Sequence, residues 1–459
     1  MYLPTRSLQS AASVLALSAM LGACSLIPDY ERPAMSIPAA FDGAKTTDTK
    51  AVVAADWWTT FKDPELEGLM QEALANNLDI AAALARIDQA QGALRSTNSA
   101  LLPQVNANGS ASGSDSSNNA TRNTRTASGD VSISYALDLW GKYRAESAAS
   151  EASFRASQFD HDATVLLIQS SVATTYFNVL ILKDRLQIAQ ESLQAALKTL
   201  DLVEQRYKFG AISALDLAQQ RANVATIQAG IPVIEDSLNS NRNALAILLG
   251  RAPEGFKVKT ESTAMLVLPT IAVGQPSTLL TRRPDIRRAE AQLQSANANI
   301  GAARAAFFPS LDLSASRSVD WVAGIGTSNG SSIAASVLAP IFSGGSLEGS
   351  LQTAKAAKAE LVATYRKTVL TSFGEVEDAM SSEDANAKRV ESLKIAADES
   401  RKAYDLSEAS YKAGAIDFSS LLDAQRTWLS ARDTLAQARL AQFTAAVNLF
   451  IALGGGWQS

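Results

Sequence analysis

The chain has 459 residues, of which 47% are apolar and 6% aromatic, and 41 Lys and Arg residues against 46 Asp and Glu residues give a formal net charge of -5. That balance excludes a nucleic-acid binder of the basic-patch kind. One cysteine and one histidine exclude a disulfide scaffold and a Cys/His zinc site, so we expect neither a metal site nor a cofactor. After residue 25 no run of about 18 apolar residues occurs, so the mature chain could cross a membrane only with strands.

The amino terminus has the pattern of a secretory signal. Residues 1–23 carry a positive charge at Arg6 and an apolar stretch at 11–20, and Leu21-Gly22-Ala23 stands immediately before Cys24. We interpret 1–23 as a signal peptide that is removed on maturation. The order Leu-Gly-Ala-Cys resembles the bacterial lipobox, which implies that Cys24 becomes the acylated first residue of a lipoprotein. The alternative is a small buried cysteine with no chemistry of its own.

The chain contains an internal duplication. The hexapeptide at 207–212 recurs at 411–416, and at the same shift of 204 residues Leu249-Gly250 falls on Leu453-Gly454. Several landmarks in one order at one offset point to duplication. We therefore divide the chain into the signal peptide (1–23), an N-terminal extended segment (24–63), a first repeat (64–250), a linker (251–275) and a second repeat with the C-terminal tail (276–459).

Each repeat is predicted to contain helix, two strands, a very long helix and a further helix. The predicted helices cover residues 64–99, 141–208, 212–249, 276–306, 345–412 and 417–453. At about 1.5 Å per residue, each of the two longest helices would extend on the order of 100 Å. Leu182, Leu186, Ala189, Leu193, Ala196, Leu200, Val203 and Tyr207 alternate at steps of four and three, which is the a/d pattern of a coiled coil. A dimeric rod without a lumen would show the same pattern.

The segments between these helices have the period of strands. Apolar and small polar residues alternate over 131–139, 311–321 and 333–341, while a first strand near 103–111 is weaker. Strands of about 9 to 11 residues with one apolar and one polar face are typical of a transmembrane barrel with lipid outside and water inside. The glycines between 324 and 330 predict a hairpin turn. An edge of a soluble sandwich is the alternative.

Four strands per chain cannot close a barrel alone. Open edges in hydrocarbon leave backbone N–H and C=O groups unpaired, at several kcal/mol each. Known outer-membrane barrels need about eight strands or more, so two chains would give a plugged barrel and three chains twelve strands around a water-filled pore. We therefore expect a homotrimer. The fold class is an α+β membrane protein with four transmembrane strands and long coiled-coil-like helices per chain.

Several motifs resemble a known family. They are Cys24 with the segment 25–30, Asp56-Trp57-Trp58 with 61–66, the stretch 283–290, the stretch 411–426 and the tail 453–457. In this order they resemble the TolC-like outer-membrane efflux proteins, in the OprM-like (NodT-type) lipoprotein branch. The resemblance implies a trimer with a twelve-stranded β-barrel on a twelve-helix periplasmic α-barrel, and an equatorial belt formed by the N-terminal segment and the linker. It also implies a periplasmic adaptor protein and an RND-type inner-membrane transporter as partners, in a Gram-negative outer membrane.

The turns after the two long helices are the candidate gate. Gly210 and Gly414 permit a tight reversal, so both turns should lie at the end of the helical tube away from the barrel. In the family this mouth is closed by polar contacts, and the matching positions here are Tyr207, Asp216, Arg221, Tyr411, Asp417, Asp423 and Arg426. The alternative is that these charges are simply solvated.

Other charged groups have a structural interpretation. The arginines at 282, 283, 287 and 288 adjoin no glycine-rich phosphate loop, so we expect them to pair with nearby carboxylates. His161 has no partners for acid–base or nucleophilic catalysis, so we expect that the protein is not an enzyme.

The sequence thus predicts a passive, gated exit duct of a tripartite multidrug efflux pump, anchored by lipid in the outer membrane with a large periplasmic portion. Two alternatives remain open. One is the outer-membrane duct of type I protein secretion, and the other is a periplasmic coiled-coil lipoprotein scaffold without a channel.

Overall fold

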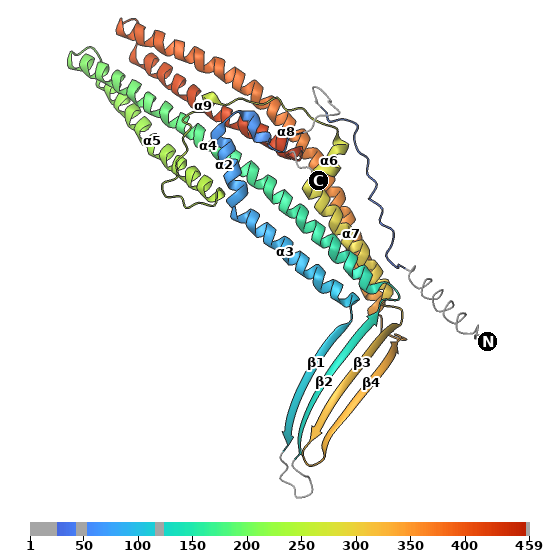
Figure 1. Cartoon of the computed structure of the whole chain (residues 1–459). Coiled ribbons are helices and arrows are strands. Elements are labelled where there is room, and N and C mark those ends of the chain that lie inside the picture. The colour runs from blue at the N-terminus through green and yellow to red at the C-terminus, as the bar shows by residue number, and fades with distance from the viewer. Residues whose placement is uncertain (1–24, 43–52, 115–123, 456–459) are drawn as a thin grey trace. The chain divides into compact units, whose positions relative to one another are not determined.

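The computed structural model describes residues 25–42, 53–114 and 124–455 (Figure 1). The predicted signal peptide and Cys24 lie outside the described residues. The chain forms two compact units, which we describe separately. The first comprises Met1–Met35, Ala85–Phe159 and Arg287–Thr368, and the second Ser36–Leu84, Asp160–Ile286 and Val369–Ser459. Each unit therefore combines segments from both halves of the sequence.

Helices make up most of the described chain. The α-helices are α2 (Pro64–Asn76), α3 (Leu78–Asn98), α4 (Lys142–Lys208), α5 (Ala214–Leu248), α6 (Pro276–Arg282), α7 (Pro284–Ala305), α8 (Ser346–Lys412) and α9 (Phe418–Ala452). Short 3-10 helices are η1 (Trp57–Phe61), η2 (Ser99–Leu101) and η3 (Thr263–Met265). Helices α4 and α8 have 67 residues each and α5 and α9 have 35 each, and both pairs are related by the offset of 204 residues. These equal lengths agree with an internal duplication.

Two helices that the sequence predicted as continuous are each broken in two. Between α2 and α3, Asn77 has an extended backbone, and its Oδ1 accepts hydrogen bonds from the backbone N–H groups of Asp79 (2.8 Å) and Ile80 (3.1 Å). Asn77 thus ends one helix and N-caps the next. Between α6 and α7, Arg283 is extended because it precedes Pro284, whose ring disfavours a helical conformation in the residue before it.

At the end of each repeat, a glycine packs closely against the helix that ends at one of these breaks. Gly250 and Gly454 have φ of 71° and 96°, which a residue with a side chain rarely adopts. A Cβ on Gly250 would clash with the carbonyl oxygen of Asn76, and a Cβ on Gly454 would lie 2.8 Å from that of Arg282. The repeated Leu-Gly dipeptide thus provides the same close approach in both halves.

The first unit contains a four-stranded antiparallel sheet in the order β1 (Gln104–Ser114), β2 (Thr124–Leu137), β3 (Ser310–Val322) and β4 (Gly326–Leu338) (Figure 1). The strands are up to 14 residues long, which exceeds the predicted length. The turn between β3 and β4 is also shorter than predicted, because Ile325 N–H donates to Val322 O at 3.1 Å and Gly326 already begins β4. Gly330 lies inside β4, opposite Ser318.

The register gives the sheet one apolar and one polar face. Residues directly opposite each other share a face, so Ile133, Ala315 and Ile333 lie together, as do Ser132, Ser316 and Ser332. We call the face with Ile133 the apolar face and the face with Ser132 the polar face. Hydroxyl groups pair across the polar face, as between Ser110 and Ser128 (2.7 Å) and between Ser316 and Ser332 (2.9 Å). The predicted alternation is confirmed.

In the same unit the segment that follows Cys24 lies along α7. Arg32 makes a bidentate ion pair with Glu290, with distances of 2.8 and 2.9 Å, and Asn297 Nδ2 donates to Pro28 O at 2.7 Å. At Gly301 a Cβ would lie 2.6 Å from the side chain of Ile27. The segment 27–32 is therefore attached closely to this helix.

Two hydrophobic cores lie among the described residues of the second unit. One gathers Trp57, Phe61, Phe177, Phe443 and Phe450, with Trp57 stacked on Phe450 at 5.1 Å between ring centroids. The other lies near the ends of the long helices and gathers Val203, Leu217, Tyr404, Tyr411, Phe418, Leu421, Leu422 and Trp428. Of the eight predicted heptad positions, three are buried and four are half-buried: Leu182, Ala196 and Val203 are buried, and Leu186, Ala189, Leu193 and Leu200 are half-buried. Tyr207, the last position, is exposed, so the predicted seam does not continue to the end of α4.

One described helix, α4, is long and apolar enough to cross a membrane by length and composition. In its most apolar window, 61% of the residues are buried in the structure. Core helices of soluble proteins meet the same criteria, so this is weak support for a helical span.

Candidate functional site

The candidate site is the pair of turns that join α4 to α5 and α8 to α9, residues 209–213 and 413–417, which we call the paired turns. Each begins with a left-handed glycine, Gly210 with φ of 67° and Gly414 with φ of 75°. Ala211 N–H donates to Arg206 O and Ala415 N–H donates to Ser410 O, both at 2.9 Å. These bonds satisfy the last carbonyls of the long helices and reverse the chain tightly.

The returning helices are capped by local side chains. Ser213 and Asp216 form a capping box: Asp216 N–H donates to Ser213 Oγ at 3.2 Å, and Asp216 Oδ2 accepts from Ser213 N–H at the same distance. At the equivalent position Asp417 N-caps α9, and its carboxylate accepts from Ser420 N–H at 2.8 Å and Ser419 Oγ at 3.0 Å. These hydrogen bonds lower the pKa of Asp417.

Arg206 joins the two turns. Its Nη2 donates to Tyr411 O at 2.8 Å and to Lys412 O at 2.9 Å, and its guanidinium lies 4.4 Å from the centre of the Tyr411 ring. A cation at the carbonyl end of α8 is favourable because that end of the helix carries partial negative charge. The end of α4 therefore holds the end of α8 through one side chain.

Aromatic residues fill the space behind the turns. Tyr411 is 2% exposed, and burial raises the pKa of its hydroxyl. Tyr404 stacks on Trp428 at 4.9 Å between centroids, and the Arg401 guanidinium lies 4.5 Å from the Trp428 ring centre. Tyr411 is thus a core residue of this end of the bundle within its own chain.

Buried polar side chains form a layer between the packed helices, which we call the buried polar layer. Asn223 Nδ2 donates to Gln425 Oε1 at 3.3 Å, which links α5 to α9, and Gln220 Nε2 donates to Ala196 O at 2.7 Å. Gln220 and Gln425 are fully buried. Such a layer fixes the register of packed helices at a cost in stability.

The seven predicted gate residues fall into two groups. Asp216, Arg221, Tyr411 and Asp417 have contacts close to the turns, with Arg221 Nη2 2.8 Å from Glu204 Oε1. Tyr207, Asp423 and Arg426 are exposed, and Arg426 makes only a 3.5 Å contact from Nε to Asn223 Oδ1. In the described part of the chain, no hydrogen bond or ion pair joins two of the seven side chains. The structure brings them to one end of the bundle without pairing them.

Sequence reasoning missed Arg206 and the buried polar layer. Arg206 directly precedes the repeated Tyr207, and the equivalent residue in the second repeat is Ser410. The available signal was that the charged residue beside the shared motif in the first repeat is a serine in the second repeat. The polar layer had no comparable signal, because Gln220 and Gln425 are not equivalent positions in the duplication.

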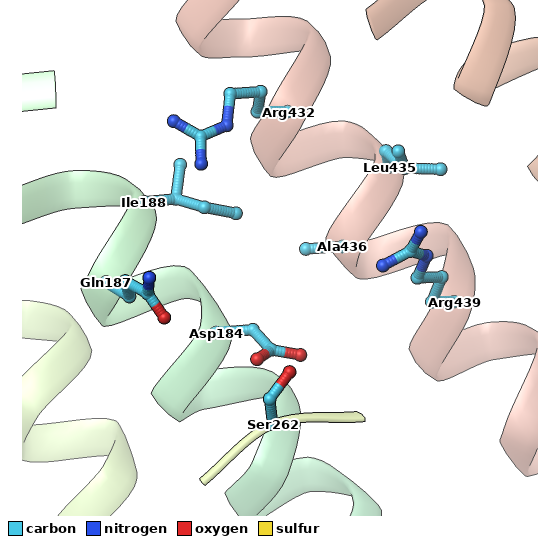
Figure 2. Close-up of a pocket in the computed structure, with 8 residues that line it drawn as sticks. All are labelled: Asp184, Gln187, Ile188, Ser262, Arg432, Leu435, Ala436 and Arg439. Carbon is cyan, nitrogen blue, oxygen red and sulfur yellow. The ribbon is translucent and has the colours of Figure 1, made fainter. Parts of the chain in front are cut away.

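A separate small cavity lies between α4, α9 and the linker (Figure 2). Arg432 and Arg439 project from α9, and Asp184 faces Ser262 of the linker. The Asp184 carboxylate accepts from Thr263 Oγ1 at 2.7 Å, and Arg432 Nη2 lies 2.7 Å from Glu191 Oε2, which lowers the pKa of Glu191. These contacts attach the linker and tie α4 to α9.

The arginine cluster is partly a structural ion-pair site, as predicted. Arg283 is largely buried, and its guanidinium lies 2.7 Å from both Asp285 Oδ2 and Glu375 Oε2. Paired carboxylates keep its pKa raised in spite of burial.

Comparison with known proteins assigns the chain to a family. The profile of the outer membrane efflux protein family matches residues 69–251 and again residues 275–455. The chain belongs to the outer membrane efflux protein family. This confirms the TolC-like resemblance predicted from its motifs.

Relatives of this efflux protein are known along its whole length. The pyoverdine export outer membrane protein OpmQ of Pseudomonas aeruginosa is 36% identical, with 97% of each chain covered. The toluene efflux pump outer membrane protein TtgC of Pseudomonas putida is 34% identical, with 99% of this chain and 96% of the relative covered. The cation efflux system protein CusC of Escherichia coli is 33% identical, with 95% and 97% covered.

The fold is shared as well. A crystal structure of CusC superimposes with a TM-score of 0.83 and 30% identity, covering 94% of this chain and all of that chain. The protein is thus an outer-membrane efflux channel of the kind that serves tripartite pumps in Gram-negative bacteria. Two of these three relatives are named for efflux and one for export.

Proposed function

We propose that three copies of the chain close a twelve-stranded barrel through the outer membrane. The observation that carries the proposal is the four-stranded sheet, in which β1 and β4 are edge strands among the described residues. An open edge in hydrocarbon is unfavourable, so β1 of one copy would pair with β4 of the next until the ring closes. Three copies give the first barrel with room for a water-filled pore.

The two faces of the sheet support an orientation in this barrel. The apolar face exposes Val131, Ile133, Trp321, Ile333 and Val337 to the surroundings of the single chain. Burying these side chains in lipid is favourable, and the hydroxyl-rich polar face then lines the pore. Within the family fold, the long helices would continue the conduit as a twelve-helix tube in the periplasm.

We place the gate of this conduit at the paired turns. α4 and α8 follow directly after β2 and β4 in the chain and end at these turns 67 residues later. Asp216, Arg221 and Asp417 have partners near their own turns. Among the described residues, Asp423 makes no side-chain hydrogen bond or ion pair, and Arg426 makes only the 3.5 Å contact with Asn223. Asp423 and Arg426 are therefore the charged groups available to pair between copies and hold the mouth shut.

The remaining parts follow from the family architecture. An RND-type inner-membrane transporter would supply the energy, and a periplasmic adaptor would bridge it to the duct. An acylated, palmitate-bearing Cys24 would anchor the mature chain. Relatives of nearly equal identity are named for pyoverdine, toluene and cations. Because one fold serves such different cargoes in different relatives, the duct would conduct passively and cargo choice would lie with the transporter.

Single-channel recording tests the gate. We expect Asp423→Ala and Arg426→Ala each to raise the conductance of the purified protein in planar bilayers several-fold, because fewer contacts hold the mouth closed. Asp216→Asn is the matched control, since its side chain serves the capping box and an asparagine can still accept there. Conductance unchanged in both alanine variants, or raised equally in the control, would contradict the assignment.

A further inference from the structure

The sheet consists of two equivalent hairpins, β1–β2 and β3–β4 (Figure 1). Leu-Pro precedes β1 and Phe-Pro precedes β3, so β1 maps onto β3 with a shift of 206 residues, from Pro103 to Pro309. The helices that follow the hairpins begin at Lys142 and Ser346, so β2 maps onto β4 with the shift of 204 residues that relates the long helices. These two shifts give every strand residue of one hairpin an equivalent in the other.

The equivalence extends to the contacts between strands. Ser110 Oγ lies 2.7 Å from Ser128 Oγ in the first hairpin. The equivalent residues of the second hairpin make the same contact, with Ser316 Oγ 2.9 Å from Ser332 Oγ. Every other pair of β1 with β2 for which both equivalents lie in strands also maps onto a pair of β3 with β4. The two hairpins therefore have the same register.

The described chain contains one of the two kinds of junction that a ring of such hairpins needs. β2 of the first hairpin pairs with β3 of the second, which puts Ser132 opposite Ser316. The other junction, which we call the seam, would join β4 of one copy to β1 of the next. We infer that the seam repeats the register of the β2–β3 junction, so that Ser336 of one copy lies opposite Ser110 of the next. This inference rests on the proposed function, because it requires copies of the chain to close a barrel.

Side-chain size supports this register. On the apolar face it puts Ile333 opposite Gly113 of the next copy, and Val337 opposite Gly109. Ile333 and Val337 are 91% and 70% exposed in the single chain, and a Cβ on either glycine would have no neighbouring atom closer than 3.9 Å. A large side chain on the adjoining strand covers the space that an edge glycine leaves open. A shift of two residues in either direction also keeps the faces aligned, but it places alanine or serine opposite both glycines.

The backbone groups of the two edges match in the same register. Ala323 N–H donates to Arg125 O at 2.9 Å, so odd-numbered residues bond across the β2–β3 junction. Because bonded and non-bonded pairs alternate along a strand, odd-numbered residues of β1 and β4 direct their N–H and C=O groups outward. The seam brings these residues together. It continues past the end of β4 to Ile341, opposite Val105, and Pro340, which has no N–H, is directed away from it.

Disulfide cross-linking tests the register. At the seam, Ser110 and Ser336 would form a non-hydrogen-bonded pair, in which side chains lie closest, and both are on the polar face, where an aqueous oxidant reaches them. We expect Ser110→Cys with Ser336→Cys, in the full protein in liposomes, to give covalent dimers and trimers on a denaturing gel. Ser110→Cys with Ala334→Cys or Leu338→Cys should cross-link about tenfold more slowly, because these diagonal pairs lie about 7 to 8 Å apart, too far for an unstrained disulfide.

The junction inside the chain provides the matched control. Ser132→Cys with Ser316→Cys occupies the equivalent pair, so it should oxidise at a similar rate without joining copies. Its oxidation is measured as protection of both thiols from a maleimide reagent. The unsubstituted protein, whose single cysteine is Cys24, and each single substitution give the background.

The pattern of cross-links separates this inference from the proposed function. If the cysteine at 110 joins the one at 334 or 338 faster than the one at 336, the copies meet edge to edge but the inferred register is wrong. If no combination joins copies while the control pair oxidises, the edges do not meet and the proposed barrel fails.

Amide hydrogen exchange in the unsubstituted protein gives a second test that needs no substitution. We expect slowed exchange at Ala339 and Ile341 in the protein assembled in liposomes, because the seam extends the ladder past the end of β4. Exchange at these amides as fast as in an unstructured peptide, in protein that conducts ions, would overturn the inferred register and leave the barrel standing.

Discussion

At the scale of single residues, the ends of the long helices are held by a few polar groups with distinct partners. Arg206 reaches across to the last carbonyls of α8, while Ser213 and Asp417 cap the helices that return. Because these contacts lie within one chain, they shape the paired turns before any second copy is present. The exposed Asp423 and Arg426 then act on a surface that is already formed.

Arg206 should stabilise the second turn from the first. We expect Arg206→Ala to speed amide hydrogen exchange at 411–415 about tenfold, because hydrogen bonds from a charged donor contribute roughly 1.5 to 3 kcal/mol. Lys208→Ala is the control, since Lys208 is exposed and makes no hydrogen bond or ion pair in the described structure. Exchange at 411–415 that is equal in the two variants would show that Arg206 does not tie the turns together.

Asp417 should make the start of α9 sensitive to acid. Its folded-state pKa is lowered from the ordinary value of 3.8 by hydrogen bonds from Ser420 and Ser419. The ionised carboxylate thus contributes stability above that value, and the contribution is lost as the pH falls through the lower folded-state pKa.

The measurement is amide hydrogen exchange at 418–422 between pH 5 and 2, in the unsubstituted protein and in Asp417→Asn. We expect the two to differ at pH 5 and to converge at the acid end, because a protonated aspartate and an asparagine both lack the charge. A constant difference over this range would mean that the charge of Asp417 does not matter to the cap.

At the scale of elements, the offset that relates the two halves also relates their close contacts. Gly250 meets the end of α2 and Gly454 meets the end of α6, so the same backbone approach closes both repeats. The breaks that create these helix ends are made by different residues, Asn77 in one half and the Arg283-Pro284 pair in the other. The duplication has therefore kept the geometry while the sequence that produces it changed.

Two glycines in different backbone conformations give predictions of opposite sign. We expect Gly250→Ala to destabilise the protein by roughly 2 to 4 kcal/mol, because alanine is strained at positive φ and its methyl group would clash with Asn76. Gly68→Ala, in the interior of α2 with open space around it, should stabilise by about 0.5 to 1 kcal/mol. Thermal unfolding of the helical circular dichroism signal checks both, and a raised midpoint for Gly250→Ala would refute the packing described here.

The elements also show how far the sequence alone could lead. The long helices and the alternation of β2 and β3 were predictable because heptad and period-two patterns are averaged over many residues. The break at Asn77 was not predictable, because asparagine in a helical pattern is a weak signal. Its capping role also depends on a distant residue, since the Asn77 side-chain amide donates to Leu248 O at 2.8 Å. The predicted turn at Gly330 is wrong, because glycine occurs both in turns and at open positions of strands.

The candidate site was predictable in place but not in its contacts. Repeated Tyr207 and Tyr411 with the glycines that follow located both turns. Local pattern cannot say which side chains pair across helices, so the bridge from Arg206 and the partner of Arg221 came only from the structure. Contacts between copies form only on assembly, so a local sequence pattern does not predict them either.

At the scale of the whole molecule, the proposed channel depends on copies that complete one another. A sheet with two open edges and one apolar face is unsatisfactory in water and in lipid alike, and a closed ring of three copies removes both problems. The seam between copies and the gate at the paired turns have meaning only inside such a ring.

Single-channel recording of the purified, unsubstituted protein in planar bilayers tests whether copies of this chain assemble into a pore. We expect discrete, uniform conductance steps that appear with the oligomeric fraction and disappear when heat dissociates it. Protein that inserts as a monomer, or that leaves the bilayer electrically silent at every concentration, would contradict the proposed assembly.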